Sequence, residues 1–222
     1  MLTLPPTTLN ATLNWNMPEP TLPITADAAP DATDDAENVR LMLRVKDGDM
    51  RAFEQLVELH QRSVIGTVAR MLNNQEDAHD IAQMVFVRVW RSAARYERSA
   101  KFTTWLYTIM KNLVFNEMRR RGRKREVSME AREEDHHIET PAPDRHNPDT
   151  MVQQSELETA IDRAIQSLPE KQRLAVLLRR HEDAPYEQIC DVLGMSLPAV
   201  KSLLFRARND LKEKLAGYLD VE

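Results

Sequence analysis

Apolar residues recur every three or four positions through the middle of this chain, which is the spacing of amphipathic helices. The pattern predicts a short helix over residues 36–46, a long helix over 49–72 and, after two asparagines, a third helix over 78–90. A fourth helix starts at Phe102 and is expected to end near Gly122. Together these elements predict a helical bundle around one apolar core.

A second set of helical patterns begins near Ser155. Pro169 stands in the first turn of one helix, where proline is tolerated, and Gly194 stops a short helix further on. The last helix starts after Ser196, a residue type that caps helix N-termini. The final two helices have the spacing of a helix-turn-helix, whose second helix is exposed for the major groove of DNA. The alternative is a packing unit with a basic surface.

Two segments lack this periodicity. Residues 1–35 contain half of the 12 prolines and residues 126–154 are acidic and contain prolines, so neither segment is expected to bury a core. We therefore predict an all-α protein of two small helical domains, at 36–125 and 155–218. A flexible acidic linker over 126–154 joins them, and a disordered acidic tail over 1–35 precedes them.

Charge is divided unevenly along the chain, although the formal net charge is only −5. Residues 91–125 hold eleven basic and two acidic side chains, and six of the seven residues over 119–125 are basic. The helix dipole favours one or two cations at a helix C-terminus, but not six. Cations beside several aromatic residues are typical of single-stranded nucleic-acid binding.

Other function classes find little support. No apolar run approaches the roughly 18 residues of a membrane span, and the single cysteine, Cys190, excludes an internal disulfide or a Cys-rich zinc site. We expect no membrane insertion, no metal, no cofactor and a cytoplasmic location. His79 and Asp80 resemble a metal phosphohydrolase pair, but no further His/Asp set surrounds them. His136–His137 lies among acids in the predicted linker, where a solvated charged run is the simpler interpretation.

Two long motifs carry a family resemblance. The segments DIAQMVFVRVW and FTTWLYTIMKNLVFNEMRRRGRK resemble region two of bacterial sigma factors, in the extracytoplasmic-function (ECF) form. The segment LPEKQRLAVLLRRHEDAPYEQICDVLGMSLPAVKSLLFRARNDLKEKL resembles region four. The matches follow the family's order and cover about residues 40–125 and 155–217.

The resemblance implies a non-enzymatic stress-response factor. It would bind core RNA polymerase, through the clamp helices of the largest subunit and the flap, and promoter DNA in duplex and single-stranded form. It would direct initiation at chosen promoters, with region two recognising and melting the minus-ten element and region four binding the minus-thirty-five element. An anti-sigma factor is a further implied partner.

The resemblance also assigns residues. The family pattern D-x-x-Q-E for polymerase binding falls on Asp80, Gln83 and Met84, where the last acid is missing. Asn112 matches an asparagine whose amide can read a base edge, and Trp105 is equally well explained as core packing. The implied minus-ten residues are Trp105, Lys111, Asn112, Arg119, Arg120, Arg121 and Arg123.

The implied minus-thirty-five residues lie in the last helix and at its start. They are Ser196, Ala199, Lys201, Ser202, Arg206 and Arg208. Relative to the family pattern, Ala199 lacks a hydroxyl and Leu203 lacks a cation. We therefore expect fewer phosphate contacts and weaker duplex binding.

Two other classes remain open at this stage. A helix-turn-helix regulator acting without polymerase would leave the first domain unexplained. A hydrolase built on His79 and Asp80 would need ligands that the sequence does not show.

Overall fold

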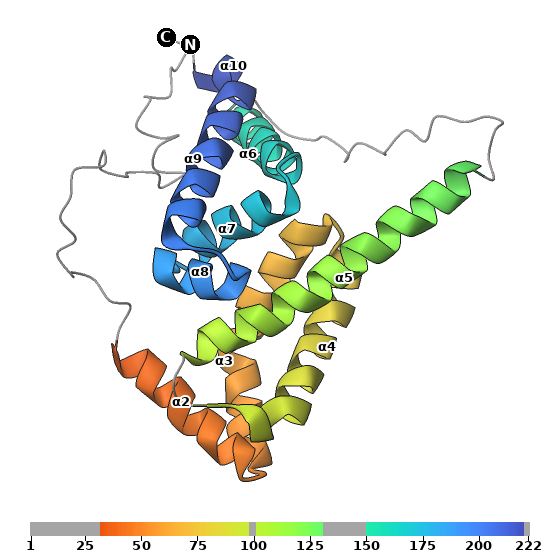
Figure 1. Cartoon of the computed structure of the whole chain (residues 1–222). Coiled ribbons are helices and arrows are strands. Elements are labelled where there is room, and N and C mark those ends of the chain that lie inside the picture. Colours follow the sequence, from red (N-terminus) through yellow and green to blue (C-terminus); the bar gives the residue numbers. More distant parts are fainter. Residues whose placement is uncertain (1–31, 98–100, 131–149, 220–222) are drawn as a thin grey trace.

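The computed structural model describes residues 32–97, 101–130 and 150–219, and in these ranges it contains helices and no strands (Figure 1). The first set of helices is α2 (Ala32–Lys46), α3 (Met50–Leu72), α4 (Gln75–Ser92), the short 3-10 helix η1 (Ala93–Arg95) and α5 (Phe102–Glu130). The second set is α6 (Thr150–Gln166), α7 (Glu170–His181), α8 (Tyr186–Leu193), α9 (Leu197–Lys214) and α10 (Ala216–Leu219). The predicted all-α class is confirmed.

The helix boundaries in the first set follow from local side-chain chemistry. Asp49 precedes α3, and its Oδ1 accepts a hydrogen bond from the N–H of Arg51 at 2.9 Å. At the other end, Asn73 takes the left-handed conformation with φ 52°. Asn74 Oδ1 then accepts a hydrogen bond from the N–H of Asp77 at 3.1 Å, which caps α4. The two asparagines therefore end one helix and start the next.

Helix α5 is longer than the sequence predicts. We expected it to end near Gly122, but it continues to Glu130. An interior glycine costs only about 1 kcal/mol relative to alanine, and the surrounding Arg, Lys, Glu and Met residues are good helix formers. Helix α6 also starts earlier than expected, at Thr150. The predicted linker over 126–154 is thus helical at both ends, and residues 131–149 lie outside the described ranges.

The predicted N-terminal tail falls almost wholly outside the described residues. Only its last part, from Ala32, belongs to α2. The polar stretch between α4 and α5 begins with η1, and residues 98–100 are likewise not described.

The two sets of helices share one apolar core. In the first set α3 packs against α2, α4 and α5, and in the second α7 packs against α8 and α9. Across the junction α5 lies against α8 and α3 lies against α7, so the second set covers one side of the first (Figure 1). Leu56, Phe102 and Met110 on one side are fully buried, as are Leu177 and Ile189 on the other.

Candidate nucleic-acid and protein interfaces

An exposed polar stripe runs along the outer face of α5. Asn112, Arg119 and Arg123 are all exposed, and intervals of seven and four residues place them on one helix face. Asn116, also exposed, lies between them and accepts a hydrogen bond at its Oδ1 from Arg119 Nη2 at 2.5 Å. The sequence motif did not single out Asn116, although its spacing from Asn112 places it on the same stripe.

Trp105 and Lys111 are half-buried rather than free. The Trp105 ring lies 5.3 Å from the ring of Tyr96 and 6.3 Å from that of Phe102, so it is part of an aromatic cluster. Lys111 Nζ donates a hydrogen bond to the carbonyl of Val192 in α8 at 2.6 Å. Burial lowers the pKa of the Lys111 ammonium.

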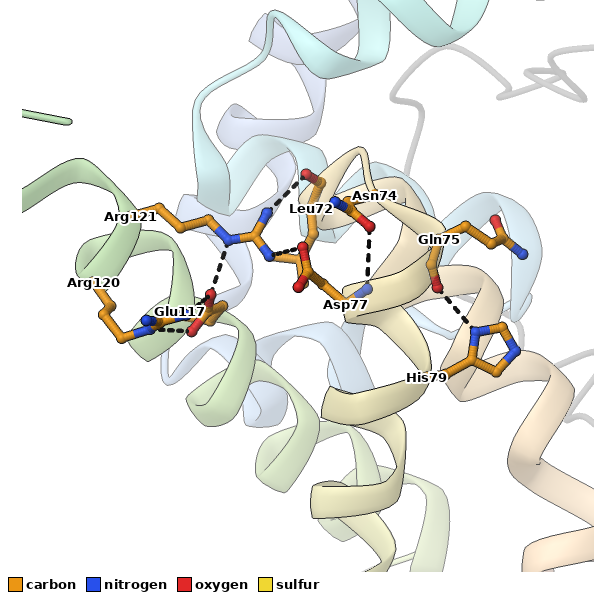
Figure 2. Close-up of polar contacts among 8 residues, drawn as sticks. All are labelled: Leu72, Asn74, Gln75, Asp77, His79, Glu117, Arg120 and Arg121. Carbon is orange, nitrogen blue, oxygen red and sulfur yellow. Dashed lines mark hydrogen bonds and ion pairs between the residues drawn. The ribbon is translucent and has the colours of Figure 1, made fainter. Parts of the chain in front are cut away.

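Arg120 and Arg121 are held in ion pairs, which Figure 2 shows. Arg120 Nε and Nη2 each lie 2.7 Å from the Glu117 carboxylate. Arg121 Nε donates to Glu117 at 2.9 Å, and its Nη2 lies 2.5 Å from the Asp77 carboxylate in α4. Its Nη1 also reaches the carbonyl of Leu72, the last residue of α3, at 3.5 Å. Arg121 therefore connects α3, α4 and α5.

The Glu117 carboxylate cancels part of the charge in the basic run. The hydrogen bond from Arg120 and then that from Arg121 lower the pKa of Glu117 to about 2, because both guanidinium groups favour the ionised carboxylate. The group is therefore ionised at neutral pH. The positive charge available at this part of α5 is smaller than a count of its arginines suggests.

The predicted polymerase-binding residues share one face of α4. Asp80, Gln83 and Met84 are all exposed, with Met84 at 46%, and they are spaced three and four residues apart. Gln83 also borders an open apolar groove of about 460 Å³ between α3 and α4. The groove is lined by Met50, Phe53, Val57, Gln61, Ile65, His79, Ala82, Gln83, Phe86, Val87 and Trp90. This face combines polar and apolar groups that suit a protein partner.

Helices α8 and α9 form the predicted helix-turn-helix. Gly194 between them has φ 64°, the left-handed conformation that glycine adopts most readily, and the two helix axes are bent by 99°. Val192 and Val200 are fully buried on the inner side of the pair. Ser196 occupies the N-cap position of α9, but its hydroxyl makes no capping hydrogen bond.

Three of the predicted minus-thirty-five residues are exposed on the outer side of α9. Lys201, Ser202 and Arg206 are exposed, whereas Arg208 is half-buried with its guanidinium 5.5 Å from the ring centre of Phe205. Ala199 is half-buried. Together with the exposed Ser196, these groups form a polar surface with two cations on the outer side of α9.

The structure places Leu203 in the core, and the weaker duplex binding expected from its missing cation stays a prediction. We interpreted this leucine as a missing phosphate contact on the DNA-binding side of the last helix. Its side chain is only 4% exposed and belongs to the core.

The sequence reasoning missed a polar cluster where the two helix sets meet. The Glu182 carboxylate, directly after α7, accepts hydrogen bonds from Ser63 and Thr67 of α3 and from Tyr107 of α5. The four residues come from distant parts of the chain. No local pattern could have indicated that they meet.

Of the remaining sequence candidates, His136–His137 lies outside the described residues, whereas His79, Asp80 and Cys190 lie within them. In the described ranges no group of three or more His, Cys, Asp or Glu side chains could hold a metal ion. His79 Nδ1 lies 2.9 Å from the carbonyl of Gln75, one turn earlier on α4 (Figure 2). Cys190 is half-buried and packs against the core.

A search of the described helices for membrane spans finds none that is long and apolar enough on its own. The α8–α9 pair meets the length and composition criteria only when the two helices are taken together across their 99° bend.

Comparison with known proteins agrees with this geometry. The model of Sigma-70 region 2 matches residues 56–124, and the model of Sigma-70 region 4 matches residues 158–211. The RNA polymerase sigma-H factor of Pseudomonas aeruginosa is 32% identical over 189 residues, which cover 82% of this chain and 96% of that protein. The ECF RNA polymerase sigma-E factor of Escherichia coli K12 is 31% identical over 177 residues, covering 79% and 92%.

Two solved structures share the fold. CnrH in complex with the cytosolic domain of CnrY matches with a TM-score of 0.60 and 22% identity, over 82% of this chain and 98% of that one. The sigma factor RpoE of Bartonella quintana, in complex with the anti-sigma factor NepR, matches with a TM-score of 0.59 and 24% identity, over 75% and 98%.

Two helical regions in this order, one ending in a helix-turn-helix, define a sigma factor, and the chain belongs to the ECF sigma factors of bacterial RNA polymerase. Its function is promoter-directed transcription initiation with core RNA polymerase, and the family is non-enzymatic. Of the three hypotheses from the sequence, a sigma factor, a helix-turn-helix regulator acting without polymerase and a hydrolase, the sigma factor is the one that these findings support.

Proposed function

We propose that the exposed stripe of α5 reads and opens the minus-ten element. Asn112 offers an amide donor and an acceptor to a base edge. Arg119 and Arg123 follow it on the same face and hold the phosphates of the separating strand. The exposure of Asn112 on one face with these two arginines is the observation that carries the proposal.

The other minus-ten residues would contribute after a rearrangement. Lys111 must release the Val192 carbonyl, and Arg121 must release Asp77, before either can contact a phosphate. Arg120 shares Glu117 with Arg121 and faces the same condition. Trp105 packs against Tyr96 and Phe102 in its aromatic cluster and would support the first turn of α5.

For polymerase binding, we assign the exposed face of α4. Asp80 and Gln83 would bond the clamp helices of the largest subunit, and the exposed Met84 would add apolar contact where the family carries an acid. Region four would contact the flap.

For the minus-thirty-five element, we assign the start and the outer side of α9. Lys201, Ser202 and Arg206 face outward and would enter the major groove, with the Ser196 hydroxyl at the helix N-terminus available for a phosphate. Arg208 and Ala199 stand at the edge of this surface and would contribute less.

We further propose domains at 36–125 and 155–218, a tail at 1–35 and a linker at 126–154. A sigma factor acts where core polymerase and promoter DNA meet, in the bacterial cytoplasm, which supports a cytoplasmic location for this chain. Two related folds are bound to partner proteins, one of them an anti-sigma factor, which supports such a regulator for this chain.

Reconstitution with core polymerase tests the assignment. The chain should confer initiation at specific promoters. Gln83→Ala should weaken binding to core polymerase without changing the affinity of region four for duplex DNA, and Arg206→Ala should do the reverse. If Gln83→Ala and Asp80→Ala both leave polymerase affinity unchanged, the α4 assignment is refuted.

A further inference from the structure

The groove between α3 and α4 exposes apolar side chains to water. Its volume is about 460 Å³, and eight of the eleven side chains that line it are apolar. Met50 is 51% exposed and Val87 is 42% exposed. Close to them the rings of Phe53 and Trp90 lie 5.1 Å apart and form the aromatic end of the groove. An exposed apolar groove of this kind indicates a binding surface.

The chain carries a matching apolar segment ahead of α2. Residues 9–17 contain no Asp, Glu, Lys or Arg. Within them Leu9, Leu13 and Met17 stand four residues apart, and Trp15 lies between the last two. Apolar side chains at such intervals are what a groove between two helices accepts from a peptide. The segment over residues 9–17 therefore has the chemistry that the groove requires.

This segment is near enough in the chain to reach the groove. Helix α2 begins at Ala32 and lies along α3, where Asn38 Oδ1 is 2.9 Å from His60 Nε2 (Figure 1). The groove lies on another face of α3, so the path to it is one or two helix diameters, about 10–25 Å. Residues 18–31 can span up to about 45–50 Å, at about 3.3–3.6 Å per residue. The segment can therefore enter the groove while α2 stays in place.

Charge favours the same placement. Residues 18–37 hold six acidic side chains and no basic one. Arg51, Arg88 and Arg91 are exposed beside the aromatic end of the groove, where Glu54 is an exposed acid. The acidic stretch connects the apolar segment to α2, and its attraction to these arginines stabilises a docked segment, most strongly at low salt.

The groove adjoins the residues proposed for polymerase binding. Gln83 lines the groove, and Asp80 and Met84 are exposed on the same face of α4. A peptide in the groove would contact Gln83 and occupy the space that a partner needs there. The groove therefore cannot hold such a peptide while the partner is bound to Gln83.

We propose that residues 9–17 dock into the groove between α3 and α4 in the free chain and compete there with core polymerase. The proposal rests on the polymerase-binding face proposed above. Docking needs little intrinsic affinity, because residues 18–31 tether the segment at an effective concentration in the millimolar range. Polymerase affinity falls with the fraction of chains whose groove is open, so docking in roughly nine chains of ten would weaken it about tenfold.

A cross-linking comparison in the full chain tests the docked state. Asn16→Cys puts a thiol in the apolar segment and Gln61→Cys puts one at the groove, in a Cys190→Ser background. Gln55→Cys is the matched control, because Gln55 is an exposed glutamine of α3 that does not line the groove. A short bismaleimide should link Asn16→Cys to Gln61→Cys about tenfold faster than to Gln55→Cys. Equal rates would overturn the proposal.

Charges placed in the segment should abolish that preference. Leu13→Asp with Trp15→Asp puts two carboxylates where the apolar groove would have to bury them, so the two cross-linking rates should become equal. Thr7→Asp with Thr8→Asp adds the same charge outside the segment and should leave the preference intact. All four positions precede α2, so the packed core is unchanged in these variants. A preference that survives Leu13→Asp with Trp15→Asp would refute docking.

The same variants test the competition with polymerase. Leu13→Asp with Trp15→Asp should raise the affinity for core polymerase about tenfold, because the groove is then open in every chain. Thr7→Asp with Thr8→Asp should leave the affinity unchanged. Titration of the labelled chain with core polymerase measures both. An unchanged affinity in the first variant would show that the segment does not compete.

The wild-type chain separates this proposal from the proposed function. If it gives promoter-specific initiation with core polymerase but neither the cross-linking preference nor the gain in affinity is found, docking is refuted and the proposed function stands. If it gives no such initiation, the proposed function is refuted, while the cross-linking rates still decide whether the segment docks.

Discussion

At the scale of single residues, the basic run of α5 contains side chains with different tasks. Arg119 and Arg123 are exposed, whereas Arg120 and Arg121 are bound to Glu117. Arg121 also connects α5 to α4. A motif that treats these arginines alike therefore overstates the number of cations available to DNA.

Substitution of Asn112 should change promoter choice. Asn112→Ala removes a base-reading amide, so we expect losses of about 1–3 kcal/mol at promoters carrying the preferred base and little change at others. Gln55→Ala, which removes an exposed amide from α3, is the matched control. The measurement is initiation from promoters that differ only in the minus-ten element. An equal loss at all of them would contradict the reading role.

Substitution of Arg119 should instead weaken binding to all promoters by a similar factor. A phosphate contact carries no sequence information, so Arg119→Ala should lower affinity uniformly and reduce the magnitude of the logarithmic salt slope by about 0.7. Titration of a single-stranded minus-ten oligonucleotide against salt measures this. An unchanged slope would show that Arg119 does not contact a phosphate.

The Glu117 pair should make stability depend on pH. The pKa of Glu117 is about 2 in the folded protein, below the ordinary value of 4.5. The contribution of the ion pair to the free energy of unfolding is therefore complete above pH 4.5 and is lost as the pH falls through about 2. The full shift would correspond to about 3 kcal/mol. Because Arg120 is 53% exposed and screened by water, we expect the ion pair to contribute only about 1 kcal/mol to the free energy of unfolding.

Urea unfolding of wild type and Glu117→Gln checks this expectation. The difference in the free energy of unfolding should be about 1 kcal/mol at pH 6 and should fade towards pH 2. Glu54→Gln, at an exposed position of α3, serves as the control. A difference that does not vary with pH would show that the Glu117 charge is not responsible.

At the scale of elements, the helices follow local rules, except that α5 ends later and α6 begins earlier than the sequence predicts. Asn73, Asn74 and Gly194 stand where the structure turns, as the sequence predicts. Gly122 does not end α5, because a single glycine costs less than the good helix formers around it contribute.

The two glycines should therefore respond oppositely to alanine. Gly122→Ala should stabilise the protein by about 0.5–1 kcal/mol, since a Cβ there meets nothing within 4 Å and the backbone is helical. Gly194→Ala should destabilise it by about 1 kcal/mol, because its φ of 64° strains any residue with a Cβ. Urea unfolding of both variants measures the signs. Two changes of the same sign would contradict this account of α5.

At the scale of the whole molecule, the two regions share a core and a polar junction. We therefore expect α3 and α7 to unfold together in the free chain, so that their backbone amides exchange with similar opening free energies. Arg173→Ala removes the bond to the Met71 carbonyl and should lower the opening free energy of α7 by about 1–3 kcal/mol relative to that of α4.

Native-state hydrogen exchange measures these opening energies helix by helix. Lys171→Ala, at an exposed position of α7, should leave them unchanged. Independent opening of α3 and α7 in the wild-type chain would show that the shared core does not couple the regions.

The sequence by itself determined the helical class, most helix ends, the helix-turn-helix and the family. Those features depend on neighbours within a few positions, such as the apolar period and the left-handed glycine at Gly194. Only the tertiary structure decided which cations are free, that Leu203 is buried and that Glu182 meets Ser63 and Tyr107. Burial and pairing depend on side chains from distant parts of the chain, and no local pattern contains that information.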